Sequence, residues 1–300
     1  MAESSNKNVP QLQQSETISQ NDETATEAQQ LFNEAEKLAK QRTIPSQVQA
    51  IQKWSEARLK WQKLGDKPQE ALTLIKLGET YKNLGATTPA LEHYTQALTL
   101  YRELNNRLQE AFTLSEIGRI YIIELEQLEK EQRLSSIHGL SFNSRLYKTW
   151  LNQTASTPEK AKEFYNEALA IYQELNNLSG EASILHAMAQ SKYLHDWQYQ
   201  QKLLEKSLAL YQEIGDKQGE ALVLGNLSKL KLIYNDQLAW LELFNKAREI
   251  YQEISDSSDF NNFTARQAEA KLLSVTASYW WSDNQKKALE FHNQALKVYQ

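Results

Sequence analysis

Apolar residues recur along this chain at helical spacing, and short polar breaks separate one apolar stretch from the next. Trp54 and Trp61 are seven positions apart, so they fall on one face of a helix after two turns. Ala57 lies between them, where a small side chain lets a neighbouring helix approach closely. The same spacing recurs at Tyr94 and Tyr101 and at Tyr165 and Tyr172. The pattern therefore predicts a chain made of amphipathic helices.

The apolar stretches form an internal repeat. The aromatic residue that closes each copy can be followed along the chain, at Trp61, Tyr101, Tyr172, Tyr211, Tyr251 and Tyr299. The successive spacings are 40, 71, 39, 40 and 48 residues, which sets a base period of about 40 residues. The spacing of 71 is one period plus 31 residues, and we place this insertion within residues 122–158.

A short polar break leads from each copy into a further helix. At Gly65-Asp66 and Asn105-Asn106, the first residue tolerates a left-handed C-cap and the second can cap the next helix. Acidic residues of a recurring Glu-Ala pair then suit the first turn of that helix, at Glu70, Glu110, Glu181, Glu220 and Glu269. Each repeat is therefore predicted to be a helical hairpin. The second helices are expected near residues 46–64, 89–104, 159–175, 199–214, 238–254 and 286–300.

Stacking of these hairpins decides the fold class. One hairpin cannot bury its apolar stripe alone, whereas a stack of hairpins can. The chain has 9 Gly and 5 Pro among 300 residues, too few for the tight turns of a sandwich, a barrel or an α/β fold. The sequence thus predicts an all-α solenoid over residues 23–300, preceded by a disordered polar tail at residues 1–22.

The repeat resembles the tetratricopeptide repeat (TPR). The residues that carry the resemblance are Leu74, Leu77, Gly78 and Tyr81, then Ala90, Tyr94 and Ala97, with Leu114, Ile117, Gly118 and Tyr121 in the next copy. It implies a right-handed superhelix of antiparallel hairpins whose first helices line a concave groove. The period of about 40 resembles the longer TPR variety. The amino-acid sequence of residues 50–121 resembles the TPR arrays of bacterial proteins that carry a C-terminal CHAT domain, a caspase-like peptidase module.

The groove implied by this resemblance offers candidate binding residues. Over the first helices taken together, the side chains one turn away from the packing stripe combine three cations with polar, apolar and aromatic groups. This mixture suits an extended or helical peptide with an acidic or carboxylate feature. The candidates are Lys82, Asn83, Arg119, Ile122, His186, Gln190, Tyr193, Lys229 and Trp281.

Motifs for catalysis, cofactors and metals are missing from the sequence. The chain has no Cys, which excludes thiol catalysis, disulfides and Cys-ligated metals. It has no HExxH, GxxxxGK[ST], GxGxxG or GxSxG motif, and His186, His195 and Asp196 lack further metal ligands. We therefore expect no catalytic residue, no cofactor and no metal, and a protein that is not an enzyme.

Charge and hydropathy narrow the class of partner. The net charge is −5, from 33 basic and 38 acidic residues of interspersed sign, which gives no electrostatic footprint for nucleic acid. No apolar stretch of about 18 residues occurs, and the N-terminus is not a signal peptide, so we expect no membrane span and a cytoplasmic location. The sequence predicts a scaffold that binds a protein or peptide in its groove.

Two other functions remain open at this point. The chain is either such a scaffold or the regulatory TPR array of a larger enzyme, such as a CHAT-type peptidase, whose catalytic domain lies beyond Gln300. A peptide-pheromone receptor of the TPR type is a third and less favoured interpretation, because residues 1–22 are too few for a helix-turn-helix domain.

Two segments carry further expectations. The last hairpin is expected to leave Ala288, Leu289, Ala295 and Val298 facing outward, since no polar capping helix follows. This predicts a fragment of a longer protein that could associate end to end, with a tolerated imperfect last hairpin as the alternative. In the insertion, residues 124–133 predict a prolonged helix and residues 135–139 a break. The apolar residues that follow predict an extra helix covering its own solenoid, with a partner-binding element as the alternative.

Overall fold

The computed structural model describes residues 9–137, 144–191, 196–234, 236–256, 262–281 and 284–299. Within these ranges the chain forms twelve α-helices and no strand, which confirms the all-helical prediction. The chain divides into two compact units, Met1–Ala168 and Leu169–Gln300, and each is described by itself.

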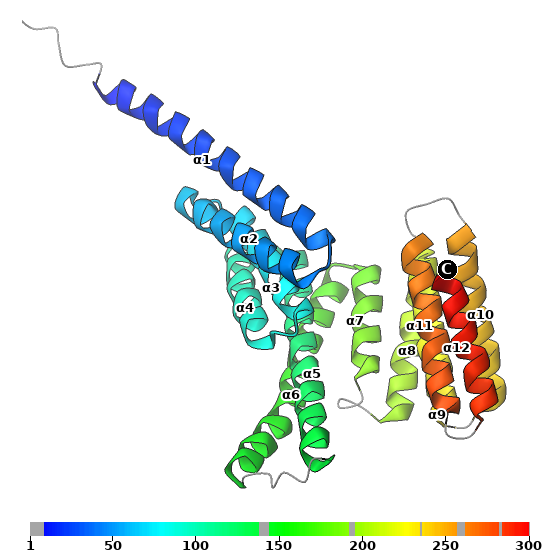
Figure 1. Ribbon diagram of the computed structural model, residues 1–300. Coiled ribbons are helices and arrows are strands. Elements are labelled where there is room, and N and C mark those ends of the chain that lie inside the picture. The colour runs from blue at the N-terminus through cyan, green and yellow to red at the C-terminus, as the bar shows by residue number, and fades with distance from the viewer. Residues whose placement is uncertain are drawn as a thin grey trace, which may run out of the picture. The chain divides into compact units, whose positions relative to one another are not determined.

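The first unit stacks three helical hairpins (Figure 1). Consecutive helices in each hairpin run antiparallel, and α2 packs on α3 and α4 on α5 to join one hairpin to the next. The helices are α1 (Val9–Lys40), α2 (Ile44–Leu64), α3 (Lys67–Asn83), α4 (Thr87–Glu103), α5 (Arg107–Ile137) and α6 (Ser144–Glu174), of which the last six residues belong to the second unit.

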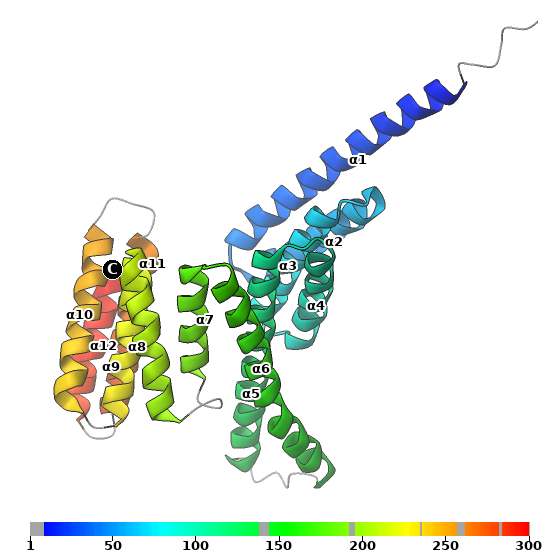
Figure 2. The same ribbon diagram turned by 180° about the vertical axis from the view of Figure 1, so that it is seen from behind.

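The second unit repeats the arrangement with three more hairpins (Figure 2). Here the first helices also meet one another, since α7 contacts α9 and α9 contacts α11. The helices are α7 (Leu178–Gln190), α8 (Trp197–Ile214), α9 (Lys217–Ile233), α10 (Gln237–Asp256), α11 (Asn262–Trp280) and α12 (Gln285–Tyr299).

The polar breaks act as the sequence predicted. Gly65 and Gly215 adopt left-handed φ angles of 72° and 71°, and Asn105 adopts 52°. The carboxylate of Asp66 accepts a hydrogen bond from the backbone N–H of Gln69 at 3.1 Å. Each break therefore ends one helix and begins the next within a few residues.

The aromatic stripe forms the core, and a glycine on the facing helix leaves room for the rings of Tyr94 and Tyr165. Tyr94 and Tyr165 are 0% and 2% exposed. A Cβ atom built on Gly78 would lie 3.0 Å from the Tyr94 ring, and one on Gly118 would lie 2.9 Å from the Tyr165 ring. The recurring Gly thus serves close helix packing rather than a turn.

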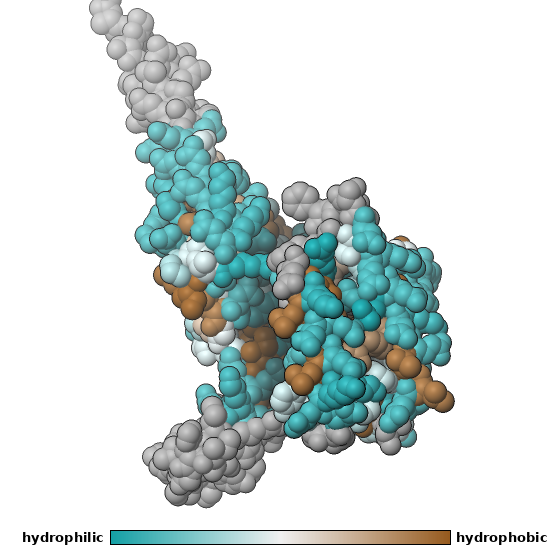
Figure 3. Space-filling view, turned by 45° about the vertical axis from the view of Figure 1, so that its right-hand side comes forward, coloured by the Kyte–Doolittle hydropathy of each residue, from teal (hydrophilic) through white to brown (hydrophobic). Residues whose placement is uncertain are grey.

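The start of the first helix differs from the expectation. Helix α1 begins at Val9, whereas a tail was expected to residue 22, because a helix that has already formed gains one backbone hydrogen bond for each residue by which it lengthens. Over the part of α1 that is coloured in Figure 3, the visible face is almost wholly hydrophilic.

The insertion does not make a separate covering helix. It lengthens α5 to Ile137 and starts α6 at Ser144, so that both extend beyond the α3–α4 hairpin of the same unit (Figures 1 and 2). The run at residues 124–133 contains no Gly or Pro, so nothing ends α5 there. Part of the expected break, residues 138 and 139, lies outside the described residues.

Candidate functional site

In the first unit, two predicted groove residues meet at one carboxylate. Lys82 of α3 and Arg119 of α5 both bind Glu116, and the distance from Arg119 Nε to Glu116 Oε1 is 3.2 Å. The Glu116 side chain is 9% exposed, whereas that of Arg119 is 41% exposed. Both cations were predicted from the sequence and the buried acid was not, although Glu116 lies one helical turn before Arg119.

This cluster carries a net charge of +1, since one carboxylate balances one of its two cations. Tyr94 lies beneath it, and burial first, then the charges of Glu116 and Glu79, raise the pKa of Tyr94. Glu79 is itself paired with Lys76 at 3.2 Å on the same helix. The exposed guanidinium of Arg119 is therefore the group through which this face can bind an anion.

Around this cluster, the other two candidates of the first unit complete a mixed surface. Asn83 is exposed next to Lys82 at the end of α3. Ile122 is half-buried one turn beyond Arg119 on α5. The face formed by α3 and α5 thus places a cation beside an amide and an apolar side chain.

In the second unit, the two candidates of α7, His186 and Gln190, form a polar cluster with Asn226 of α9. His186 is 7% exposed, and its Nε2 lies 2.8 Å from Asn226 Nδ2 and 3.0 Å from Gln190 Nε2. Both amide nitrogens are donors, so this arrangement requires Nε2 as the acceptor. The buried histidine therefore joins α7 to α9, and no ligand is needed to satisfy it.

The remaining candidates of the second unit are more accessible. Lys229 is exposed on α9, and Trp281 is 51% exposed with its ring edge-on to His292 at a centroid distance of 6.1 Å. Tyr193 lies outside the described residues. The structure brings His186 and Gln190 together and leaves Lys229 and Trp281 as separate exposed groups.

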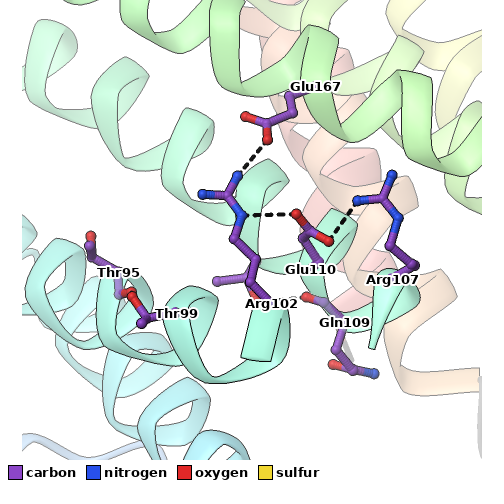
Figure 4. A network of polar contacts seen from close by, with 8 residues as sticks. Thr95, Thr99, Arg102, Arg107, Gln109, Glu110 and Glu167 are labelled. Carbon is purple, nitrogen blue, oxygen red and sulfur yellow. Dashed lines mark hydrogen bonds and ion pairs between the residues drawn. The ribbon is translucent and has the colours of Figure 1, made fainter. Parts of the chain in front are cut away.

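A second polar network shows why Glu-Ala recurs (Figure 4). Glu110, only 5% exposed, accepts from Arg102 Nε at 2.9 Å and from Arg107 Nη1 at 2.7 Å. Arg102 also reaches Glu167 of α6, at 2.5 Å. The glutamate thus ties α5 to the preceding helix α4 in addition to suiting the helix dipole.

The same tie recurs at the other glutamates, as a contact with the second helix of the preceding hairpin. The pairs are Arg58 with Glu70 at 3.5 Å, Gln173 with Glu181 at 2.8 Å, Gln212 with Glu220 at 3.0 Å and Arg248 with Glu269 at 3.1 Å. The motif therefore has a structural role between hairpins, which its position in the sequence alone did not reveal.

Among the residues that the structure describes, no group of three or more His, Asp or Glu side chains is placed to hold a metal ion. None of the helices in the same part of the chain is long and apolar enough to cross a membrane.

Comparison with known proteins shows the fold. No family model matches the chain, and no curated protein matches it. The crystal structure of BtubC (BKLC) from P. vanneervenii is similar over 86% of this chain and 90% of that chain, with 18% identity and a TM-score of 0.53. A Rap protein complexed with Competence and Sporulation Factor is similar over 91% and 75%, with 15% identity and a TM-score of 0.57. Both neighbours are TPR-like repeat proteins, so the chain has a TPR-like fold.

Proposed function

We propose that this chain is a non-catalytic cytoplasmic scaffold that binds an acidic peptide or protein segment on its first helices. The observation that carries the proposal is the cluster on α3 and α5, where Lys82 and Arg119 share the single buried carboxylate of Glu116. The similar Rap protein was crystallised in complex with Competence and Sporulation Factor, which supports a binding role for this fold.

The chemistry of the cluster defines the ligand. Glu116 is buried and already paired, so it holds Lys82 and Arg119 in place while the excess positive charge stays at the surface. A carboxylate of the partner would pair with the half-exposed Arg119, and Asn83 and Ile122 would contact neighbouring parts of the peptide. A charge-assisted hydrogen bond of this kind is worth about 1.5–3 kcal/mol.

A peptide selection followed by affinity measurement tests this proposal. Peptides selected from a random library against the full chain are expected to carry an acidic side chain or a free C-terminus. Arg119→Gln should weaken their binding about tenfold, as a loss of about 1.4 kcal/mol implies. The matched control is Lys63→Gln, an exposed cation on α2. Equal affinity of the Arg119→Gln variant and the parent protein would contradict the proposal.

A second proposal assigns the same face to regulation. The resemblance of residues 50–121 to the arrays of CHAT-domain proteins supports a regulatory TPR array of a larger enzyme whose catalytic domain lies beyond Gln300. Ligand binding would then shift the population of solenoid conformations. The intact mass of the native protein distinguishes the two, because a scaffold of this chain alone has a mass of 34.6 kDa.

The outer face of α12 supports end-to-end self-association as a third proposal. Leu289 and Leu296 are 51% and 61% exposed on one face of this helix. Ala288 and Ala295, expected to face outward, are buried at 0% and 4%, because they pack against α11. Leu296→Glu should abolish any concentration-dependent increase in mass on sizing at two concentrations, and an unchanged increase would contradict this proposal.

A further inference from the structure

Glu116 occupies the inner side of both cations in the cluster on α3 and α5. Its oxygen Oε2 accepts a hydrogen bond from Lys82 Nζ, and its other oxygen, Oε1, accepts from Arg119 Nε at 3.2 Å. The Glu116 side chain is 9% exposed, that of Lys82 19% and that of Arg119 41%. An anion that arrives from solvent therefore meets two cations already bound to a carboxylate from within, and it reaches mainly Arg119.

The repeat shows that the fold does not need an acid at this position. Glu116 follows the recurring Glu110 by six residues, and the other recurring glutamates define the same position on their own helices. A basic, a small, an amide and a branched apolar side chain stand there, at Lys76, Ala187, Asn226 and Val275. What is particular to α5 is that this residue binds two cations, so the property that Glu116 changes is the charge of the cluster.

We propose that Glu116 is a specificity-determining residue, which makes the cluster favour a carboxylate with one negative charge over a phosphate group with two. The inference rests on the binding function proposed above. An arginine can form the same bidentate hydrogen bonds with a carboxylate and with a phosphate, so the geometry of Arg119 does not separate the two. The charge does, because Lys82, Arg119 and Glu116 together carry one positive charge, which a carboxylate balances and a phosphate exceeds.

The surroundings of Glu116 strengthen its effect on a bound anion. Tyr94 beneath the cluster is 0% exposed, and burial first, then the charges of Glu116 and Glu79, raise its pKa. Glu79 forms an ion pair with Lys76 at 3.2 Å, so these two residues add no net charge. Water screens a charge poorly in such a place. The carboxylate of Glu116 therefore repels a bound anion in proportion to the charge of that anion.

Two matched peptides test this proposal on the full chain. The first is a selected peptide whose binding weakens in Arg119→Gln, and in the second a phosphoserine replaces the acidic residue that binds Arg119. Where the binding group is the C-terminus, an amidated phosphoserine replaces the last residue. At pH 8, where phosphoserine carries close to two charges, Glu116→Gln should shift the ratio of the two affinities about tenfold toward the phosphopeptide. Any loss of order in Lys82 and Arg119 affects both peptides alike, so it does not move this ratio.

Glu103→Gln is the matched control, because it removes the same charge from an ion pair with Lys67, at 3.0 Å, at the opposite end of α3 from Lys82. It should leave the ratio within about twofold of that of the parent protein. Glu116→Asn, the residue that α9 carries at the equivalent position, repeats the test should Glu116→Gln fail to fold. An unchanged ratio in the folded Glu116 variants overturns this inference and leaves the binding proposal intact. If no selected peptide depends on Arg119, the binding proposal is overturned and this inference with it.

Discussion

Replacing Glu110 by Gln isolates the contact that ties one hairpin to the next. The substitution keeps the shape of the side chain and removes the charge that Arg102 and Arg107 bind at 2.9 and 2.7 Å. Hydrogen bonds to a charged partner contribute about 1.5–3 kcal/mol each, and loss of one member of a buried ion pair costs about 3–5 kcal/mol. Both arginines are almost half-exposed and can regain contacts with water. We therefore expect Glu110→Gln to lower the free energy of unfolding by about 1.5–3 kcal/mol.

The lowered pKa of Glu110 predicts how the stability difference between the parent protein and Glu110→Gln changes with pH. Burial by itself raises the pKa of Glu110, but the hydrogen bonds and charges of Arg102 and Arg107 outweigh it, so the pKa lies below the ordinary 4.5. A carboxylate with a lowered pKa stabilises the fold fully above its unfolded pKa, and this stabilisation is lost as the pH falls from there through the folded value. The difference in free energy of unfolding between the parent protein and Glu110→Gln should therefore be constant near neutrality and shrink below pH 4.5.

Urea unfolding followed by far-ultraviolet circular dichroism at neutral and acidic pH measures both effects. Glu167→Gln is the control, because that carboxylate binds the same Arg102 at the surface and should cost about 0–1 kcal/mol. Equal stability of Glu110→Gln and the parent protein at neutral pH, or a difference that does not shrink on acidification, would refute the reasoning.

Three other predictions concern packing, a buried hydrogen bond and a cap, and thermal or urea unfolding checks each. Gly118→Ala should destabilise by about 1–3 kcal/mol because its Cβ would lie 2.9 Å from the Tyr165 ring, whereas Gly225→Ala, with a nearest contact of 3.4 Å, should be neutral or stabilising. Ser207→Ala should cost about 1 kcal/mol, since its buried hydroxyl donates to a carbonyl of α7 at 2.7 Å. Asp216→Ala removes a cap hydrogen bond of 2.9 Å and should also cost about 1 kcal/mol. Equal loss in Gly118→Ala and Gly225→Ala, or no loss in the other two, would contradict these assignments.

The sequence predicted best what depends on nearby residues. The break at Gly65-Asp66 and the stripe at Trp54 and Trp61 are local signals, and the structure shows the left-handed turn, the cap and the buried aromatics there. The start of α1 at Val9 was missed because a polar composition does not show whether an anchored helix continues into solvent.

The candidate site was predictable only in part. Lys82 and Arg119 were identified from their helix faces, but their common partner Glu116 depends on how α3 and α5 lie against each other. His186 was expected in a groove and is instead satisfied by Asn226, forty residues later in the next first helix. Contacts between consecutive first helices depend on the stacking of hairpins, which the period alone does not specify.

Amide hydrogen exchange of the full chain, with and without a peptide selected against it, tests the binding proposal most directly. The account predicts slower exchange on α3 and α5 around Lys82 and Arg119 when the peptide is bound. It also predicts that this protection weakens in Arg119→Gln and persists in Lys63→Gln. Protection confined to the outer faces of α2 and α4, with none on α3 and α5, would contradict it.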